Sequence, residues 1–251
     1  CSAGPARRQR VAIVGAGPAG LSCARDLRRL GYPVTIFEER SQPGGLNSYG
    51  VAEYKMRLPL ALAEAKMVLD LGVELKTGVR VGTHITMDAL RKEFDAVFVA
   101  VGLGATRRLG IPGEDLNGVA DALAFIEQLK SHPHATTRIG RQVVVVGAGN
   151  TAIDAATQAK RLGAERVTIV YRRGEEDMSA YDYEFELAKK DACEFRFHTV
   201  PKRILGDANV AGLECVRSEL GPAVGNGKRA FTEVSGSTHV IECDTIFRAL
   251  G

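Results

Sequence analysis

A repeated glycine-rich motif constrains the fold of this chain more than any other feature. The run Val11-Ala-Ile-Val-Gly-Ala-Gly-Pro-Ala-Gly20 returns as Val143-Val-Val-Val-Gly-Ala-Gly-Asn-Thr-Ala152, and the two leading glycines are 132 residues apart. Each copy is a short apolar run, a glycine-rich turn and then a helical pattern. A continuous run rich in β-branched residues is typical of a parallel strand that is buried on both faces. The sequence therefore predicts an α/β protein with two strand–turn–helix units.

The residues after each motif complete a strand–helix–strand unit. The predicted elements are, in chain order, a helix over 18–30, a strand over 34–37, a helix over 151–162 and a strand over 167–171. Gly31 and Gly163 follow the two helices, and a glycine just past a helix end is a usual stop signal. Further helices are expected over 59–71 and 183–190, and a further buried strand over 96–101.

The first motif has the complete order of a dinucleotide-binding fingerprint. Gly15, Gly17 and Gly20 form G-x-G-x-x-G directly after a strand. The first glycine permits a tight turn, the second lets the backbone approach a pyrophosphate, and the third lets the helix pack closely on the sheet. Glu38 ends the second strand, where an acid that binds a ribose hydroxyl is expected. A glycine turn alone is weak evidence, but the whole order predicts a dinucleotide site.

The second motif is a variant of the same fingerprint and predicts a second dinucleotide. Gly147, Gly149 and Ala152 form G-x-G-x-x-A, an accepted form. The following strand ends in Arg172 and Arg173 instead of an acid. Guanidinium groups can bind a ribose 2′-phosphate through charge-assisted hydrogen bonds, so the pattern favours NADP, with NAD as the other possibility. An alternative stays open, in which both arginines are solvated charges at the strand end.

Charge and cysteine usage exclude several classes of protein. The net charge of +3, from 33 basic and 30 acidic residues, is too balanced for a nucleic-acid-binding protein. No apolar stretch approaches the roughly 20 residues of a membrane span. None of the cysteines forms a C-x-x-C pair, so no metal site, redox dithiol or iron–sulfur cluster is predicted, and the scatter suits a reducing cytoplasm. The five are Cys1, Cys23, Cys193, Cys215 and Cys243.

From Arg10 to its end the chain resembles the glutamate synthase small-subunit family, which includes the pyridine-nucleotide-oxidising portion of dihydropyrimidine dehydrogenase. The motifs that carry this resemblance are Gly15-Ala-Gly-Pro-Ala-Gly20, Glu38, Pro43-Gly-Gly-Leu46, Tyr49-Gly-Val-Ala-Glu-Tyr-Lys55, Phe98-Val-Ala-Val-Gly102, Ile111-Pro-Gly-Glu114, Val145-Val-Gly-Ala-Gly-Asn-Thr151, Val170-Tyr-Arg-Arg173 and Thr245-Ile-Phe-Arg-Ala-Leu-Gly251. Glu186-Leu-Ala-Lys-Lys190 and Cys193-Glu-Phe195 are similar to the dihydropyrimidine dehydrogenase branch.

The resemblance implies a glutathione-reductase-like fold of two Rossmann-like dinucleotide-binding domains, with the nicotinamide domain inserted in the FAD domain. The first part of the FAD domain would span 1–106, the NAD(P)-binding domain 107–243, and 244–251 would return to the FAD domain. The cofactors would be FAD at the first motif and NADP, or NAD, at the second. The last strand ends at Gly251 with no tail, so we expect the sequence to be part of a longer chain.

The resemblance also assigns residues to each cofactor. Those implied for FAD are Gly15, Ala16, Gly17, Pro18, Ala19, Gly20 and Leu21 at the pyrophosphate, Glu38 at the ribose, Gly45, Leu46 and Gly102 near the flavin, Lys55 as a basic contact, and Val81 at the adenine. Those implied for the nicotinamide nucleotide are Gly147, Ala148, Gly149, Asn150, Thr151, Arg172 and Arg173. Ala249, Leu250 and Gly251 would approach both cofactors.

The implied function is electron entry. Hydride would pass from NAD(P)H to FAD, and electrons would continue through iron–sulfur centres of a partner domain or subunit to a catalytic subunit that reduces a pyrimidine or makes glutamate. Direct hydride transfer needs no protein acid or base, so no catalytic side chain is predicted. The histidines are then surface or loop residues: His84, His132, His134, His198 and His239.

Two departures from the family leave alternatives open. Relatives carry an N-terminal domain with cysteine clusters and continue past the final glycine into a Gly-Asp segment, and neither is in this sequence. One alternative is therefore a cofactor-binding fragment without turnover. The other is a flavoenzyme of the disulfide-reductase kind, which would need a C-x-x-C pair near the flavin.

Overall fold

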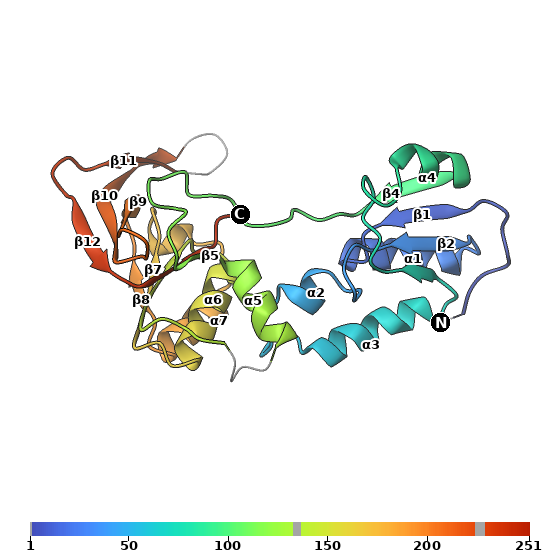
Figure 1. Ribbon diagram of the computed structural model, residues 1–251, viewed down its shortest axis with the longest axis horizontal. Coiled ribbons are helices and arrows are strands. Elements are labelled where there is room, and N and C mark those ends of the chain that lie inside the picture. Colours follow the sequence, from blue (N-terminus) through green and yellow to red (C-terminus); the bar gives the residue numbers. More distant parts are fainter. Residues whose placement is uncertain (1, 133–136, 224–228) are drawn as a thin grey trace. The chain divides into compact units, whose positions relative to one another are not determined.

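The computed structural model describes residues 2–132, 137–223 and 229–251. The chain forms two compact units, Cys1–Gly104 and Ala105–Gly251 (Figure 1). Within the described ranges, no helix is long and apolar enough to cross a membrane.

The first unit is built on a four-stranded parallel sheet. Its strands are β1 (Val11–Val14), β2 (Val34–Phe37), β3 (Glu74–Lys76) and β4 (Ala96–Val99), in the spatial order β3-β2-β1-β4. Every residue of β1 and β2 is buried, as expected for apolar strands covered on both faces. The strand β1 has strand neighbours on both sides. The first glycine turn follows its carboxyl end in the chain.

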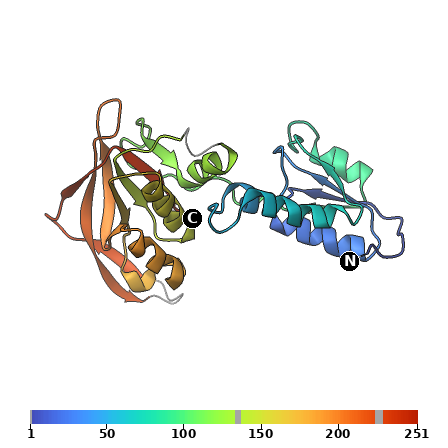
Figure 2. The ribbon, with the colours of Figure 1, turned by 90° about the horizontal axis from the view of Figure 1, so that it is seen from below.

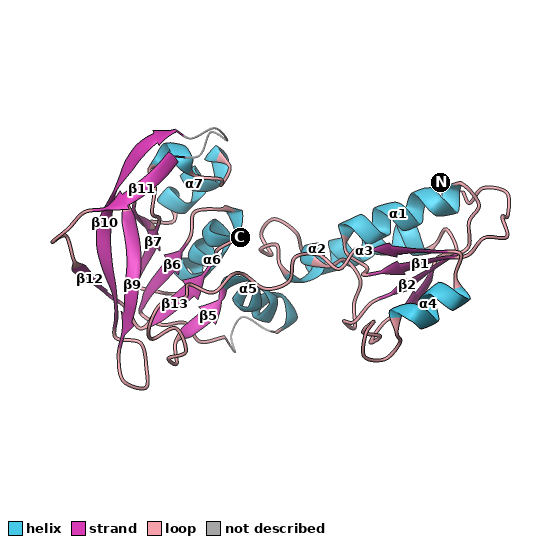
Figure 3. Cartoon of the chain, turned by 90° about the horizontal axis from the view of Figure 1, so that it is seen from above, coloured by secondary structure: helices cyan, strands magenta, loops and turns pink. Residues whose placement is uncertain are grey.

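Helices cover both faces of this sheet. Helix α1 (Pro18–Arg29) and helix α3 (Leu58–Leu69) pack on the face that includes Ile13 and Ile36. Helix α4 (Met87–Glu93) packs on the opposite face, and Figure 3 shows α1 and α4 on either side of the sheet. A short helix, α2 (Leu46–Tyr49), lies between β2 and α3 in the chain. The unit therefore has the doubly wound α/β arrangement that the sequence predicts.

The strand expected over 96–101 is present as β4, but it is shorter than expected and is not buried. Strand β4 ends at Val99 and lies at the edge of the sheet, and Phe98 and Val99 are 41% and 55% exposed. An apolar run alone cannot distinguish a central strand from an edge strand, because the difference is whether a further strand or helix covers it.

The second unit is built on a five-stranded parallel sheet with helices on one face. Its elements are β5 (Val119–Asp121), α5 (Ala122–Ser131), β6 (Gln142–Val146), α6 (Asn150–Arg161), β7 (Arg166–Val170), the 3₁₀ turn η2 (Glu175–Asp177), α7 (Asp182–Lys190), β8 (Glu194–Arg196) and β13 (Thr245–Arg248). The strand order is β5-β13-β6-β7-β8. Alanines and valines of β6, β7 and α6 form its core.

Antiparallel strands cover the other face of this sheet. They are β9 (Thr199–Leu205), β10 (Gly212–Ala223), β11 (Arg229–Glu233) and β12 (His239–Glu242). Strand β10 pairs with each of the other three. Val144 and Val146 of β6 pack against Leu213 and Cys215 of β10, and these strands lie along one flank of the unit (Figure 2).

The predicted helices and strands of the two glycine-rich units are confirmed to within one residue at most ends. Helix α1 stops before Gly31, which has a φ of 92°, and α6 stops before Gly163, which has a φ of 103°. Only glycine adopts such angles at little cost, which explains why both helices end at these glycines.

The predicted return of 244–251 to the first domain is wrong for strand β13. This strand pairs in parallel with β6, where Thr245 lies opposite Val143, and with β5 on its other side. Ile246 and Phe247 are buried in the second unit. Strand β13 therefore belongs to the second compact unit, Ala105–Gly251. Both sheets are parallel and accept a short apolar strand, so the sequence pattern could not select between them.

Candidate dinucleotide-binding sites

The first glycine turn leaves no room for a side chain at Gly15 or Gly20. Gly15 has a φ of 103°, and a Cβ there would lie 2.4 Å from the carbonyl oxygen of Ala100. A Cβ on Gly20 would lie 2.0 Å from the carbonyl oxygen of Gly15, where α1 crosses the turn. The turn and helix thus approach each other as closely as the fingerprint requires, which confirms the structural part of the prediction.

The second glycine loop of this unit packs directly against that turn. The Gly44 amide donates to the Ala16 carbonyl at 2.8 Å. Gly45 has a φ of 53°, and a Cβ on it would lie 2.7 Å from the Cα of Gly17. Leu46 follows as the first residue of α2 and is 55% exposed. Residues of two sequence motifs that are 28 positions apart therefore form one backbone surface.

Glu38 joins the turn to the end of β2. Its side chain is buried, and its two carboxylate oxygens accept hydrogen bonds from the amides of Ala16 at 2.7 Å and Arg40 at 2.9 Å. The carboxylate therefore orients the turn, a role that the sequence does not reveal. Each carboxylate oxygen can accept a second hydrogen bond, so a ribose hydroxyl is compatible with these contacts.

The other predicted residues of the first unit lie in three places. Val81 packs in the cluster that contains Val14 and Phe37, and so lies near the end of β2. The Nζ of Lys55 lies 5.6 Å from the centre of the Tyr54 ring, in the segment after α2. Gly102 is exposed beyond the end of β4, with a φ of 72°.

The second glycine turn repeats the geometry of the first. Gly147 has a φ of 132°, its amide donates to the Val170 carbonyl at 3.0 Å, and a Cβ on it would lie 2.4 Å from the Ala249 carbonyl oxygen. The Ala249 amide donates to the Val146 carbonyl at 2.9 Å. The predicted segment Ala249 to Gly251 therefore begins beside this turn.

Both helices that follow the turns have a glycine as the N-cap residue. Gly17 precedes α1 and Gly149 precedes α6, each with extended backbone, and among the described residues no side chain caps either helix. The first N–H groups of such helices lack intrahelical acceptors, and the positive end of the helix dipole points the same way. Both turns therefore have the donor set that binds a pyrophosphate.

A segment that the sequence analysis missed borders the second turn. The amide of Ala180 donates to the Ala148 carbonyl at 3.2 Å, and the amide of Tyr181 donates to Oδ1 of Asn150 at 3.0 Å. A Cβ on Gly149 would lie 3.2 Å from Oγ of Ser179. These contacts join residues about 30 positions apart, and no spacing rule for the fingerprint includes them.

Arg172 and Arg173 follow the carboxyl end of β7, beside the end of β6 that leads into the second turn. The guanidinium of Arg172 lies 5.2 Å from the centre of the Phe231 ring. The backbone is held by Oγ of Ser218, which donates to the Arg172 carbonyl at 2.7 Å, and by the His198 amide, which donates to the Arg173 carbonyl. In parallel α/β sheets this end of the strands is where ligands bind.

Glu114 holds the segment at the start of the second unit. It accepts hydrogen bonds from the amides of Leu109 at 2.7 Å and Gly110 at 2.9 Å, and pairs with Nη1 of Arg248 at 3.2 Å. Burial disfavours its charged form, but these amides and the nearby Arg108 outweigh burial and hold the pKa of Glu114 below its usual value. The carboxylate is therefore a charged anchor between this segment and β13.

The thiols show no sign of chemical activation. Burial raises the pKa of Cys193 to about 11 and of Cys215 and Cys243 to about 12. Cys23, Cys193, Cys215 and Cys243 are free thiols, and the described residues contain no group of three or more potential ligands that could hold a metal ion. Cys1 and His134 lie outside the described residues.

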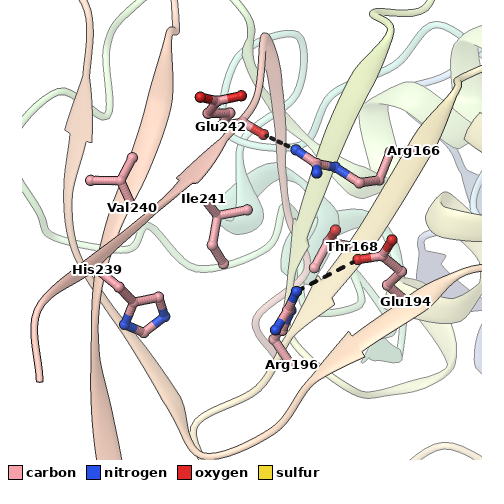
Figure 4. A pocket seen from close by; sticks show the side chains of 8 residues that line it. All are labelled: Arg166, Thr168, Glu194, Arg196, His239, Val240, Ile241 and Glu242. Carbon is pink, nitrogen blue, oxygen red and sulfur yellow. Dashed lines mark hydrogen bonds and ion pairs between the residues drawn. The ribbon is translucent and has the colours of Figure 1, made fainter.

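A cavity of about 320 Å³ lies elsewhere on the second unit, between the two sheets (Figure 4). Its lining on the parallel sheet comes from Arg166 and Thr168 of β7 and from Glu194 and Arg196 of β8, and no residue of the second glycine turn lines it. Arg166 donates to the Glu242 carbonyl at 3.1 Å, and Arg196 lies 4.0 Å from Glu194. Its positive side chains already have partners, and it is not part of the dinucleotide sites.

Comparison with known proteins agrees with this geometry. The chain is 40% identical over 252 residues to the NADPH-Fe(3+) oxidoreductase subunit beta of Geobacter sulfurreducens, covering 98% of this chain and 38% of that protein. It is 34% identical over 255 residues to the glutamate synthase [NADPH] small chain of Escherichia coli, covering 97% of this chain and 54% of that protein. The chain thus spans about two fifths to half of these relatives.

Solved structures and a family model extend the comparison. The structure of Mycobacterium tuberculosis FprA in complex with NADPH matches with a TM-score of 0.83 at 24% identity, over 98% of this chain and 71% of that one, which shows a shared fold. The predicted resemblance to the glutamate synthase small chain is confirmed. The model of the pyridine nucleotide-disulphide oxidoreductases matches residues 9–251, and the chain belongs to this family of oxidoreductases.

Proposed function

We propose that this chain is the electron-entry module of a larger enzyme, binding FAD on its first unit and NADPH on its second. The observation that carries the proposal is the presence of two complete glycine turns, at Gly15 and Gly147, each at the end of a central parallel strand and each followed by a helix without a side-chain cap. One dinucleotide would need one such site. A pair is what hydride transfer between a nicotinamide nucleotide and a flavin needs.

Different residues would hold different parts of the two cofactors. The amides at the starts of α1 and α6 would hold the two pyrophosphates. Glu38 would accept from the ribose of FAD while it keeps the Ala16 amide in place. When bound, the flavin supplies a hydride acceptor, so the protein's part in that step is to orient the two rings and to exclude water. For this reason we assign no side chain as an acid or base.

The proposed partner is an iron–sulfur protein or domain joined to a catalytic subunit. Its support is that relatives are named as a subunit beta and a small chain, and that this chain spans only part of them. No C-x-x-C pair occurs in the sequence. The electrons would therefore leave the flavin for a centre outside this chain.

Loss of FAD is the expected result of replacing Glu38 by alanine. The substitution leaves the buried Ala16 amide without its acceptor and removes the ribose contact, and each loss costs about 1–3 kcal/mol. We expect the FAD content of purified protein, measured by chromatography of a heat extract, to fall at least about tenfold.

The neighbouring residue provides the control for this test. Glu39 is exposed and pairs with Arg80 at 3.1 Å, so Glu39→Ala should retain FAD. Full FAD occupancy in Glu38→Ala would show that the carboxylate does not serve the flavin nucleotide. Wild-type protein that binds no FAD, even when purified with added flavin, would contradict the proposed function itself.

A preference for NADPH over NADH should depend on Arg172 and Arg173. Replacing both by alanine removes the positive charge beside the proposed 2′-phosphate, and each charge-assisted hydrogen bond is worth about 1.5–3 kcal/mol. We expect the KM for NADPH to rise about tenfold or more while the KM for NADH changes little. The measurement is steady-state reduction of an artificial electron acceptor by each nucleotide.

Arg203→Ala is the matched control for this prediction. Arg203 is on β9 of the same unit, is exposed, and pairs with Glu214 at 2.9 Å. Its removal lowers the charge of the unit without touching the end of β7. Equal changes for both nucleotides in the double variant, or a wild-type preference for NADH, would refute the role of the two arginines.

A further inference from the structure

Two stacked tyrosines are largely exposed at the start of α7. The ring centroids of Tyr181 and Tyr183 are 5.6 Å apart with an interplanar angle of 12°, and the two residues are 59% and 69% exposed. Aromatic side chains carry large apolar faces, and a pair of them held together in water forms a ready contact surface for another flat group. The elements that adjoin the pair indicate which ligand could contact this surface.

The position of the pair connects it to the second glycine turn. The Tyr181 amide is bound to the side chain of Asn150, the first residue of α6, and the preceding Ala180 amide is bound to the carbonyl of Ala148 in the turn itself. Helices α6 and α7 lie side by side (Figure 1). The tyrosine pair therefore lies next to the turn that we assign to the pyrophosphate of the second unit.

The tyrosines are not needed to attach α7 to the unit. Phe185 and Ala188 are the residues of α7 that are buried against the rest of the unit, together with Glu184. The hydroxyl of Tyr183 donates to Oε1 of Glu184 at 3.3 Å, and the two rings stack on each other. Because both residues are more than half exposed, a ligand can reach much of their surface.

We propose that Tyr181 and Tyr183 form an aromatic wall of the nicotinamide-dinucleotide site, on which a heteroaromatic ring of the bound nucleotide stacks. This inference rests on the proposed function, in which the second turn binds NADP. In that proposal the amides at the start of α6 would contact phosphate and Arg172 and Arg173 would contact the 2′-phosphate, and neither set is assigned to a base. Stacking on an aromatic side chain supplies that missing contact, since the π-face of a nucleobase binds well to such rings.

The test is the dissociation constant of NADP⁺, measured by isothermal titration calorimetry on the whole protein. Tyr181→Ala combined with Tyr183→Ala should weaken binding about tenfold or more, in the range known for removal of an aromatic stacking partner. Tyr181→Phe combined with Tyr183→Phe keeps both rings and loses only the hydroxyls, so it should bind within about twofold of wild type. Thermal unfolding of all three proteins reports whether the substitutions disturb the fold.

The possible outcomes separate this inference from the proposed function. Wild-type protein that binds NADP⁺, with an alanine variant that is folded and binds equally well, would overturn the aromatic wall and leave the proposed function intact. A phenylalanine variant as weak as the alanine variant would also overturn it, because the hydroxyls would then be the contact. Wild-type protein that binds no NADP⁺ would contradict the proposed function and the wall together.

Discussion

Replacing Glu114 by alanine is expected to lower the free energy of unfolding by about 3 kcal/mol or more. The Glu114 side chain is only 4% exposed and Arg248, its partner on β13, is 19% exposed. Removing the carboxylate leaves that guanidinium and the amides of Leu109 and Gly110 without their acceptor. The loss is large because a buried charge without its partner is costly. Urea unfolding followed by far-ultraviolet circular dichroism measures it.

Glu165→Ala is the matched control for this stability prediction. Glu165 belongs to the same unit and pairs with Arg141 at 2.6 Å, but the two side chains are 56% and 78% exposed. Solvent screens such a pair, so its loss should cost no more than about 1 kcal/mol. If both variants lose the same stability, burial of Glu114 does not set the strength of its contacts.

Replacing Gly147 by alanine should abolish measurable binding of NADP⁺, with the affinity reduced by about 100-fold or more, or roughly 3 kcal/mol. The Cβ would lie 2.4 Å from the Ala249 carbonyl oxygen, and the φ of 132° is unfavourable for any side chain. The backbone must therefore move, and the amides that we assign to the pyrophosphate move with it. Calorimetric titration with NADP⁺ tests this, and the FAD content should not change because the first turn is in the other unit.

A second glycine with a positive φ separates steric clash from backbone strain. Gly163 has a φ of 103°, but a Cβ on it would meet nothing within 4 Å. Gly163→Ala should therefore lose about 1 kcal/mol of stability and keep its affinity for NADP⁺. If Gly163→Ala weakens NADP⁺ binding as much as Gly147→Ala does, the effect comes from general destabilisation and not from the turn.

Local sequence was sufficient to locate both glycine turns. The β-branched runs at Val11 and Val143, the glycines after them and the stop at Gly31 act through backbone sterics and burial within a few residues of each other. Such short-range constraints are visible in sequence, and for this reason the strands, turns and helices of both units were predicted closely. The Arg172–Arg173 pair was visible for the same reason, because it follows directly from the end of a strand.

Only the tertiary structure decided which sheet each remaining strand joins and which distant residues border the turns. Strand β13 is placed by its pairing with β5 and β6, and β4 is exposed because it is an edge strand; neither property is encoded in the apolar run itself. Tyr181 reaches the second turn through a hydrogen bond to Asn150, across about 30 residues of chain. Contacts of this kind depend on how whole elements pack. The sequence by itself therefore determined the two glycine turns, and the packing of the elements determined what surrounds them.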